Sequence, residues 1–554
     1  MQFSVALLLS LLLLSSAQQQ PPPAAEPPSI ACKSTLYPKL CRSILSAFRF
    51  SPSDPYHYGK FTIKQCLKQA SQLSKTINHY LAGHPRAAAM SPLETLAMQD
   101  CGQLADLNVG YLEKISSELK AAEAMTGELV DEVTSLLSGV VTNQQTCYDG
   151  LVDSKSGFAS ALGAPLGNMT QLYSVSLALV TNALDRNMKK MKHRFLTKPS
   201  GVRQPLETLI KALRKSSRRG SSGERALSEL SGHGILINKT VIVSHNGNRT
   251  FTNISDAIAS APSNSEPKNG YFVVYAIEGY YEEYVVVPKD KKNILLIGDG
   301  KNKTIITGSH NRVDNWTTYN SSTFAVSGER FVAVDITFRN TAGPEKHQAV
   351  AVRNSADFST FYRCSFEGYQ DTLYVHSLRQ FYRDCDIYGT VDFIFGNAAA
   401  VFQNCNLYAR KPLPYQKNAF TAQGRTDPYQ NTGISIQNCT IEAAPDLAMN
   451  LSFAPSYLGR PWKTYSRTVF MESFIGAVIH PAGWLEWNGT DGLDTLYYGE
   501  FANYGPGANT SMRVHWPGYR VMDAAQAVNF TLFNFTMGDT WLPDTDIPFF
   551  GGLF

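Results

Sequence analysis

Two aspartates in the second half of the chain stand at equal distances from two cysteines. Asp371 lies seven residues after Cys364, and Asp392 lies seven residues after Cys385. If the cysteines hold equivalent positions in successive turns of a repeating structure, the aspartates do so too, with Cα atoms roughly 5 Å apart. Two carboxylates this close rarely ionise together, so one pKa is expected to rise and the other to fall. The spacing therefore predicts a proton donor beside an anion, although an aspartate ladder held by turn amides remains an alternative.

The repeat that would position this pair is visible around four cysteines. Each unit has aromatic or aliphatic residues, then a polar residue, then cysteine, then an apolar residue. The first two intervals between the cysteines are 21 and 20 residues, which is about one coil of a β-solenoid, and the third is 34, which implies an inserted loop. A β-sandwich stays possible, but the period favours the solenoid. The units are Phe361–Phe366, Phe381–Ile387, Val401–Leu407 and Ile434–Ile441.

Geometry alone leaves the reaction open, because carboxyl groups about 5 Å apart also suit a retaining glycosidase.

The same stacking distance suits a Cys364–Cys385 disulfide. We interpret the remaining pair, Cys405 and Cys439, as a structural bridge, since no Cys-x-x-Cys occurs. The histidines, such as His347 and His376, match no metal-ligand spacing, and we predict surface or cleft positions for them.

The first half of the chain has helical periodicity instead. Leu129, Val133, Leu136 and Val140 recur at steps of four, three and four, which predicts a bundle of four main helices over residues 30–193. Residues 194–237 form a basic linker rich in Ser and Gly, either simply solvated or cut by a protease, and residues 238–554 form the strand-rich domain.

The ends of the chain and its composition indicate export. Residues 1–17 have the apolar run of a cleaved signal peptide, and residues 18–29 form a Pro- and Gln-rich tail. No later stretch suits a membrane anchor, so we expect none in the mature form. Nine cysteines fit an oxidising compartment, and a net charge of +4 favours an anionic ligand but falls far short of a nucleic-acid footprint. Glycosylation sequons occur throughout, among them Asn238, Asn248, Asn253, Asn302, Asn315 and Asn488.

Five motifs in order over the strand-rich domain resemble the plant pectin methylesterases. They are Gly279–Glu283, Gln348–Arg353, Gln370–Leu373, Asp392–Gly396 and Leu458–Trp462. The helical part resembles the pectin methylesterase inhibitor domain that precedes many of these enzymes as a pro-region. The resemblance implies a helical bundle followed by a right-handed parallel β-helix, acting on methyl-esterified homogalacturonan outside the cell. It also implies an inhibitor domain, in the same chain or external, as a partner.

The resemblance also assigns roles to single residues. It implies that Asp392 is the nucleophile, that Asp371 is the general acid and then the base, and that Gln348 and Gln370 donate hydrogen bonds to the oxyanion. Gln370 could instead belong to a glutamine ladder. Arg460 would orient Asp392, while Trp462 and Thr318 would contact the sugar. No metal or cofactor is implied.

For the helical domain the resemblance implies disulfides Cys32–Cys41 and Cys101–Cys147, with Cys66 unpaired. One departure concerns the linker: Arg218-Arg219 is followed by Gly220-Ser221 where the family has two leucines. The sequence therefore leaves the place of processing open.

Two other hypotheses compete. A β-helical hydrolase or lyase of the glycosidic bond would shorten the polymer, whereas an esterase releases methanol alone. A non-enzymatic inhibitor-like or wall-binding protein would do neither.

Overall fold

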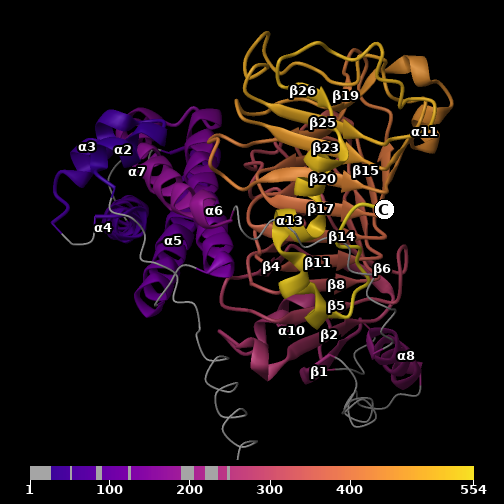
Figure 1. Ribbon diagram of the computed structural model, residues 1–554. Coiled ribbons are helices and arrows are strands. Elements are labelled where there is room, and N and C mark those ends of the chain that lie inside the picture. Colours follow the sequence, from indigo (N-terminus) through magenta and orange to yellow (C-terminus); the bar gives the residue numbers. More distant parts are fainter. Residues whose placement is uncertain are drawn as a thin grey trace, which may run out of the picture.

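The computed structural model describes residues 26–49, 53–82, 90–122, 126–188, 205–218, 235–245 and 250–554. A helical bundle and a β-helix lie side by side, as Figure 1 shows. The predicted signal peptide, residues 1–17, lies outside the described residues, as does Asn248. Among the residues described, no helix is both long enough and apolar enough to cross a membrane.

Four long helices build the bundle: α4 (Pro55–Leu81), α5 (Pro92–Ala121), α6 (Gly127–Asp153) and α7 (Gly157–Met188). Their starts follow from local sequence. Ser91 and Glu94 form a capping box at α5, and Thr126 caps α6 through the backbone N–H of Leu129. The periodic apolar residues of α6, including Val133 and Val140, are buried in the bundle core. The amino-terminal end adds short helices α2 (Pro28–Ala31), η1 (Cys32–Ser34) and α3 (Pro38–Leu45).

Both predicted disulfides of the bundle are present. Cys32–Cys41 ties η1 to α3, and Cys101–Cys147 ties α5 to α6. Cys66 is a buried free thiol, as predicted.

Three parallel sheets form the β-helix within the described ranges, and from β2 to β22 successive coils add one strand to each sheet. The coils of the β-helix wind in the right-handed sense, as expected. Sheet A contains β1 (Ile237–Val243), β2 (Tyr271–Ala276), β5 (Ile294–Ile297), β8 (Val332–Val334), β11 (Ser359–Tyr362), β14 (Arg379–Arg383), β17 (Ala399–Gln403), β20 (Gly433–Gln437), β23 (Arg467–Met471), β25 (Tyr497–Phe501) and β26 (Tyr519–Val521).

The other two sheets follow the same order of coils. Sheet B contains β3 (Gly279–Glu282), β6 (Thr304–Gly308), β9 (Thr337–Asn340), β12 (Ser365–Glu367), β15 (Asp386–Gly389), β18 (Asn406–Ala409), β21 (Thr440–Ala443) and β24 (Phe474–Ile475). Sheet C contains β4 (Val285–Val287), β7 (Phe324–Val326), β10 (Val352–Asn354), β13 (Leu373–Val375), β16 (Ile394–Gly396), β19 (Asn418–Gln423) and β22 (Ser456–Gly459).

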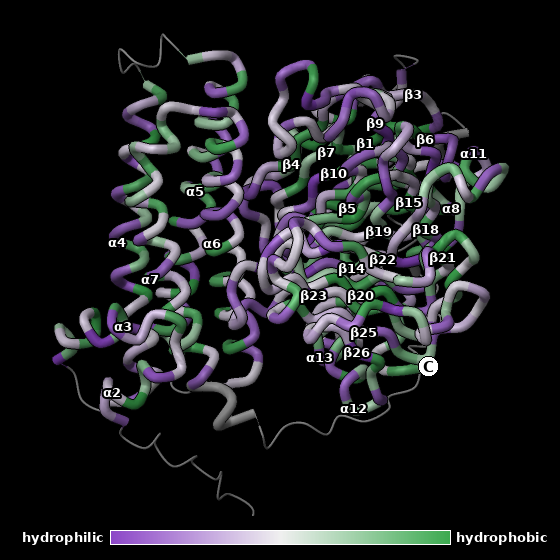
Figure 2. The backbone as a smooth tube through the Cα atoms, turned by 90° about the horizontal axis from the view of Figure 1, so that it is seen from above, coloured by the Kyte–Doolittle hydropathy of each residue, from purple (hydrophilic) through white to green (hydrophobic). Residues whose placement is uncertain are grey.

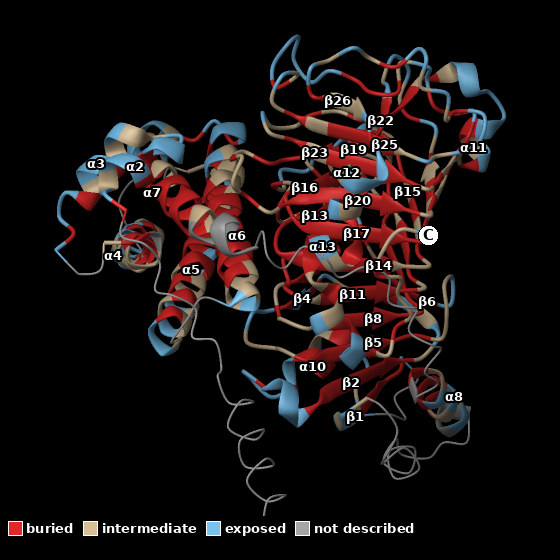
Figure 3. Cartoon of the chain, viewed as in Figure 1, coloured by how far each residue is buried: buried red, intermediate tan, exposed pale blue. Residues whose placement is uncertain are grey.

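The repeated aromatic residues stack inside the β-helix. Phe361 and Tyr382 lie 5.3 Å apart between ring centroids, and Tyr382 and Phe402 lie 4.4 Å apart, both pairs nearly parallel. Figure 3 shows the strands as a continuous buried column. These stacks fix the register of the coils, because a slip of one residue would turn the aromatic rings outward.

The four cysteines of the repeat line this interior as a ladder of free thiols: Cys364, Cys385, Cys405 and Cys439. The predicted Cys364–Cys385 and Cys405–Cys439 disulfides are therefore wrong. Neighbouring parallel strands point their β-carbons in the same direction, so these atoms stay about 4.8 Å apart. A disulfide needs them about 3.8 Å apart. Each thiol instead faces a backbone carbonyl, as Cys385 does at 3.4 Å from the oxygen of Phe361.

Part of the predicted linker is also structured. Residues Pro205–Arg218 form helix α8, whose apolar side is buried against the outer face of sheet A, so this segment is not simply solvated. The carboxyl-terminal helices α12 (Ala524–Ala527) and α13 (Leu532–Thr536), with η6 (Val528–Phe530), η7 (Gly538–Thr540) and η8 (Leu542–Thr545), follow the last strand of sheet A. Short helices α10 (Ile254–Ala259), η3 (Pro267–Asn269), η4 (Pro344–Lys346), α11 (Pro445–Ala448) and η5 (Leu451–Phe453) occupy the loops.

Candidate active site

The two aspartates lie in equivalent turns of successive coils. Asp371 sits between β12 and β13, and Asp392 between β15 and β16. Leu373 pairs in register with Ile394, two residues beyond each aspartate, so the aspartates face each other across one coil step. Both have left-handed backbones, with φ of 62° and 53°. The same turn repeated in phase thus presents both carboxyl groups on one side of the β-helix.

Arg460 contacts one member of the pair. It follows β22, and its guanidinium donates two hydrogen bonds of 2.7 Å to the two carboxylate oxygens of Asp392. This paired geometry is the strong form of a charge-assisted contact. The guanidinium also lies 4.4 Å from the ring centre of Trp487, which supports it from another side.

These contacts make the two carboxyl groups unequal. Burial, then the neighbouring Asp392 carboxylate, raises the pKa of Asp371 well above its usual value, against the opposing charge of Arg460. Burial also raises the pKa of Asp392, while the Arg460 hydrogen bonds and charge oppose that rise. The expected fall of one pKa is not seen, because both groups are almost fully buried. The pair is nonetheless unequal, because the Arg460 hydrogen bonds favour the anionic form of Asp392 and no such bonds are formed by the Asp371 carboxyl group among the described contacts.

A cavity of about 330 Å³ lies over the pair. All seven predicted site residues line it: Thr318, Gln348, Gln370, Asp371, Asp392, Arg460 and Trp462. Trp462 is fixed by close packing, because a β-carbon on Gly424 would meet its ring at 2.7 Å. The cavity also has aromatic walls that sequence reasoning missed, and single aromatic residues give no positional signal in a chain rich in them: Tyr319, Tyr374, Phe395 and Trp487.

The bundle forms one wall of the same cavity. Residues of α5 and α6 contribute to its lining: Leu93, Asp100, Thr146, Asp149, Gly150 and Asp153, followed by Ser154. Asp149 forms an ion pair of 2.8 Å with Lys463, and the backbone oxygen of Asp153 accepts a 2.9 Å hydrogen bond from Arg312. Figure 2, viewed from above, shows α6 on the side of the bundle that faces the β-helix.

Further contacts join the two domains around this opening. Asp100 accepts hydrogen bonds from Thr317 at 2.6 Å and from Asn320 at 2.5 Å. Burial, opposed by these bonds and by Arg353, raises the pKa of Asp100 to about 7. No motif in the helical half marks these residues, because packing between domains leaves no periodic pattern.

Of the two histidine positions predicted from the sequence, one is confirmed and the other is wrong. His347 is exposed, as predicted. His376 is fully buried, so its predicted surface or cleft position is wrong. Its ring contacts Ser355 and, across the domain boundary, Thr146 at 3.0 Å, and burial lowers its pKa well below the usual value. It acts as a neutral hydrogen-bonding group in the interface. In the part of the chain that the structure describes, no group of His, Cys, Asp and Glu side chains is arranged to hold a metal ion.

A parallel β-helix with two stacked carboxyl groups beside a helical domain is the architecture of a polysaccharide-acting enzyme joined to a helical pro-region. The sequence profile of the family Pectinesterase matches residues 240–539, and that of Plant invertase/pectin methylesterase inhibitor matches residues 28–179. The chain belongs to the pectinesterase family and carries an inhibitor-type amino-terminal domain.

Individual relatives of the chain have the same family names. The chain is 65% identical over 541 residues to the Arabidopsis thaliana protein "Probable pectinesterase/pectinesterase inhibitor 25", covering 95% of this chain and 87% of that protein. It is 65% identical over 538 residues to "Probable pectinesterase/pectinesterase inhibitor 47" of the same plant, covering 95% and 86%. Among solved structures it is similar to "Pectin methylesterase from Carrot", with 54% identity and a TM-score of 0.56, covering 56% of this chain and 98% of that one.

Proposed function

We propose that this enzyme hydrolyses the methyl esters of homogalacturonan through its aspartate pair, giving pectate and methanol. The observation that carries the proposal is the inequality of the pair: Asp392 is bound at both oxygens by Arg460, while Asp371 is buried beside it without such a contact among the described hydrogen bonds. An anion next to a proton donor is the arrangement that nucleophilic ester cleavage requires.

In the first half-reaction a carboxylate oxygen of Asp392 attacks the C6 carbonyl carbon, and the carbonyl electrons move to its oxygen. The side-chain amides of Gln348 and Gln370 stabilise this oxyanion. The intermediate then collapses, the bond between C6 and the methoxy oxygen breaks, and Asp371 gives its proton to the departing group. Methanol leaves, and an acyl anhydride remains on Asp392.

In the second half-reaction Asp371, now a carboxylate, takes a proton from water. The resulting hydroxide attacks the same C6 carbon, and the bond to Asp392 breaks. The product is the free C6 carboxylic acid, which loses its proton to solvent as galacturonate, and the starting aspartate pair is restored. From the lining of the cavity, Trp462 stacks on a sugar ring and Thr318 contacts the substrate.

The deciding experiment measures methanol release from methylated pectin by a form containing residues 205–554, with polymer length followed in parallel. Asp392→Ala should abolish methanol release without changing the circular dichroism spectrum. Shortened or unsaturated polymer ends would support a glycosidic-bond enzyme instead, and turnover retained in Asp392→Ala would refute the nucleophile.

We infer further that the bundle inhibits its own catalytic domain. Support comes from the cavity, which residues of the bundle line, with Asp149 in contact with Lys463 and Asp153 in contact with Arg312. The bundle therefore stands beside the aspartate pair, where a bulky polymer would have to bind. The full chain should therefore release methanol more slowly than the 205–554 form, and equal rates would contradict inhibition within the chain.

The proposed place of action is the cell wall. The apolar start of the chain and its sequons support secretion, and mass spectrometry of the secreted protein, before and after glycosidase treatment, tests signal removal and glycan load together.

A further inference from the structure

Helix α8 lies on the far side of the catalytic domain from the bundle. Figures 1 and 2 agree on this placement: the bundle stands on one side of the β-helix, and α8 on the other. In the chain, α8 comes between the end of α7 at Met188 and the start of β1 at Ile237. The amino-terminal half of the protein therefore holds the catalytic domain at two separate places.

The contact of α8 with the β-helix is apolar at its centre. Leu206, Leu209, Ile210 and Leu213 recur on one side of the helix, and each is at most 2% exposed. They belong to one buried cluster with residues of strands β2, β5, β8 and of the carboxyl-terminal helices. The opposite side carries exposed Lys211 and further polar residues. Such a two-sided helix has its stable position on an apolar surface.

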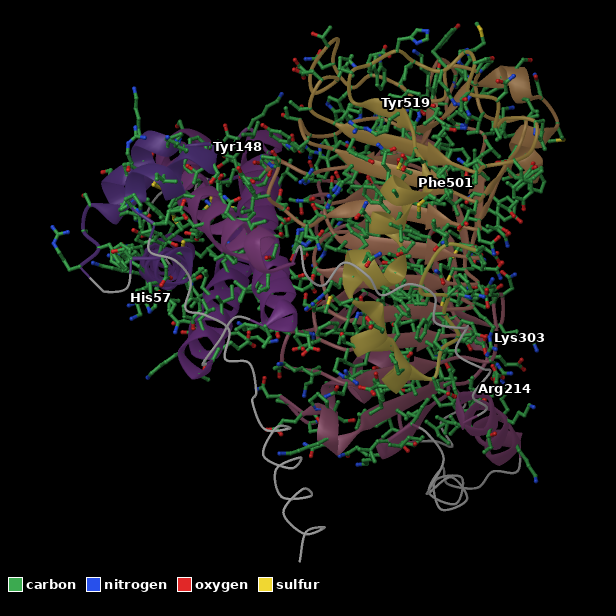
Figure 4. The ribbon with its side chains drawn as sticks, in the orientation of Figure 1. His57, Tyr148, Arg214, Lys303, Phe501 and Tyr519 are labelled. Carbon is green, nitrogen blue, oxygen red and sulfur yellow. A yellow bond between two sulfur atoms is a disulfide. The ribbon has the colours of Figure 1, made fainter. Side chains whose placement is uncertain are left out.

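Ion pairs border this apolar contact. Glu207 of α8 contacts Arg363, which donates bonds of 2.7 and 2.8 Å to Asp335. Asp335 in turn accepts a 2.9 Å bond from Arg214 of α8, and Arg214 also lies 3.5 Å from Asp299. Two charges of the helix thus enter a network with three charges of the β-helix, at the edge of the domain where Figure 4 labels Arg214.

The start of α8 is held by the other end of the chain. The backbone N–H of Leu206 donates a 2.8 Å hydrogen bond to the carboxylate of Asp546, which follows η8. A carboxylate at the first turn of a helix satisfies a free donor and stabilises the helix dipole. The β-helix thus has a docking surface for this particular helix. It consists of the apolar cluster, the ion pairs at its border and the Asp546 carboxylate at the start of the helix.

We propose that α8 is a second anchor, which keeps the bundle on the catalytic domain even when the chain is cut after α8. The basic pair Arg218-Arg219 stands at the end of α8, so a cut there or later leaves the bundle and α8 on one fragment. That fragment binds at two sites. Joining two contacts by a short connection raises retention by about 10²–10⁴-fold over one contact. Chain cleavage alone then leaves the cleft covered, and release requires α8 to undock.

The test compares two forms of the full chain with an inserted protease site. One site stands within 189–204, before α8, and the other within 219–234, after it. After cutting, each catalytic domain is immobilised by its carboxyl terminus, and the dissociation rate of the bundle is measured by surface plasmon resonance. The bundle should leave at least about 100-fold more slowly when the cut follows α8. Equal rates in the two forms would overturn the anchor.

Matched variants of the form cut after α8 isolate the helix contact. Leu209→Ala with Leu213→Ala removes apolar contacts while keeping a helix-favouring residue, and should raise the dissociation rate toward that of the form cut before α8. Lys211→Ala with Lys215→Ala changes the exposed side of the same helix and should leave the rate unchanged. A leucine pair without effect, or a lysine pair with an equal effect, would refute the proposal. The readout is dissociation, so a failure of the proposed catalytic mechanism would not affect it.

Discussion

Gly139 offers a direct way to test the closed arrangement of bundle and β-helix. It lies inside α6, where a β-carbon would stand 2.9 Å from a methyl carbon of Leu378, which belongs to the β-helix. Leu378 is itself buried between the domains, so it has little room to move. We predict that Gly139→Ala opens the cleft while leaving the bundle folded.

The magnitude follows from two opposing effects. Carbon atoms in favourable contact stand about 3.5–4.0 Å apart, so the added methyl group is roughly 0.6 Å or more too close. Overpacking of this kind costs about 1–3 kcal/mol, which weakens docking about 5- to 150-fold. Within the helix, replacing glycine by alanine stabilises the bundle by up to about 1 kcal/mol. The bundle of the variant should therefore be at least as stable to unfolding as before. Its docking on the β-helix should be weaker.

The assay is methanol release by the full chain, with thermal unfolding measured alongside. Gly163→Ala on α7 is the matched control, because its β-carbon meets nothing within 4 Å and the helix gain is the same. Activity should rise in Gly139→Ala alone. A double-mutant cycle with Leu378→Ala should show that the two substitutions are coupled. If Gly139→Ala and Gly163→Ala have equal activity, the close contact does not hold the cleft shut.

Three more positions in the cleft and the buried thiols give further expectations. Asp100 has a docked pKa of about 7 and an ordinary value of about 3.9 when exposed, so docking takes up a proton and strengthens as pH falls from 7 toward 4; Asp100→Asn should flatten the pH dependence of bundle dissociation. Arg460→Met removes the contact that opposes the raised pKa of Asp392, so the acidic limb of the methanol-release profile should move to higher pH, and an unmoved limb would contradict the role of Arg460. Gln348→Ala should lower kcat about 10²–10³-fold with little change in KM. The five free thiols are buried, so they should react with a thiol reagent only on unfolding; rapid labelling of any of them in the native protein would contradict this expectation.

The repeat in the sequence is sufficient to predict the stacking of the aspartate pair. Asp371 and Asp392 hold the same place relative to their cysteines, and a solenoid converts equal sequence spacing into spatial neighbourhood. The same repeat misled the disulfide prediction, since the spacing of Cys364 and Cys385 gives their separation along the stack but not the direction of their β-carbons. The contact between Arg460 and Asp392, 68 residues apart, needed the family resemblance.

The contacts between domains escaped prediction for a different reason. Asp100 and Asp149 are single acidic residues on helices, and nothing in their spacing distinguishes a buried partner from a solvated one. In α8 the signal was present but outweighed. Leu206, Leu209 and Leu213 recur at helical intervals, yet the basic and Ser-rich residues around them indicate a linker, either solvated or cut by a protease.

Both disulfides among the described residues belong to the bundle, and Cys101–Cys147 joins α5 to α6 beside Asp100 and Thr146, which line the cavity. Closing a loop of 46 residues contributes about 4 kcal/mol to the stability of such a domain. The described cysteines of the β-helix are all free thiols, so the stability of this domain does not depend on disulfide bonds. Reduction of the two disulfides would therefore lower the stability of the bundle and leave that of the β-helix unchanged.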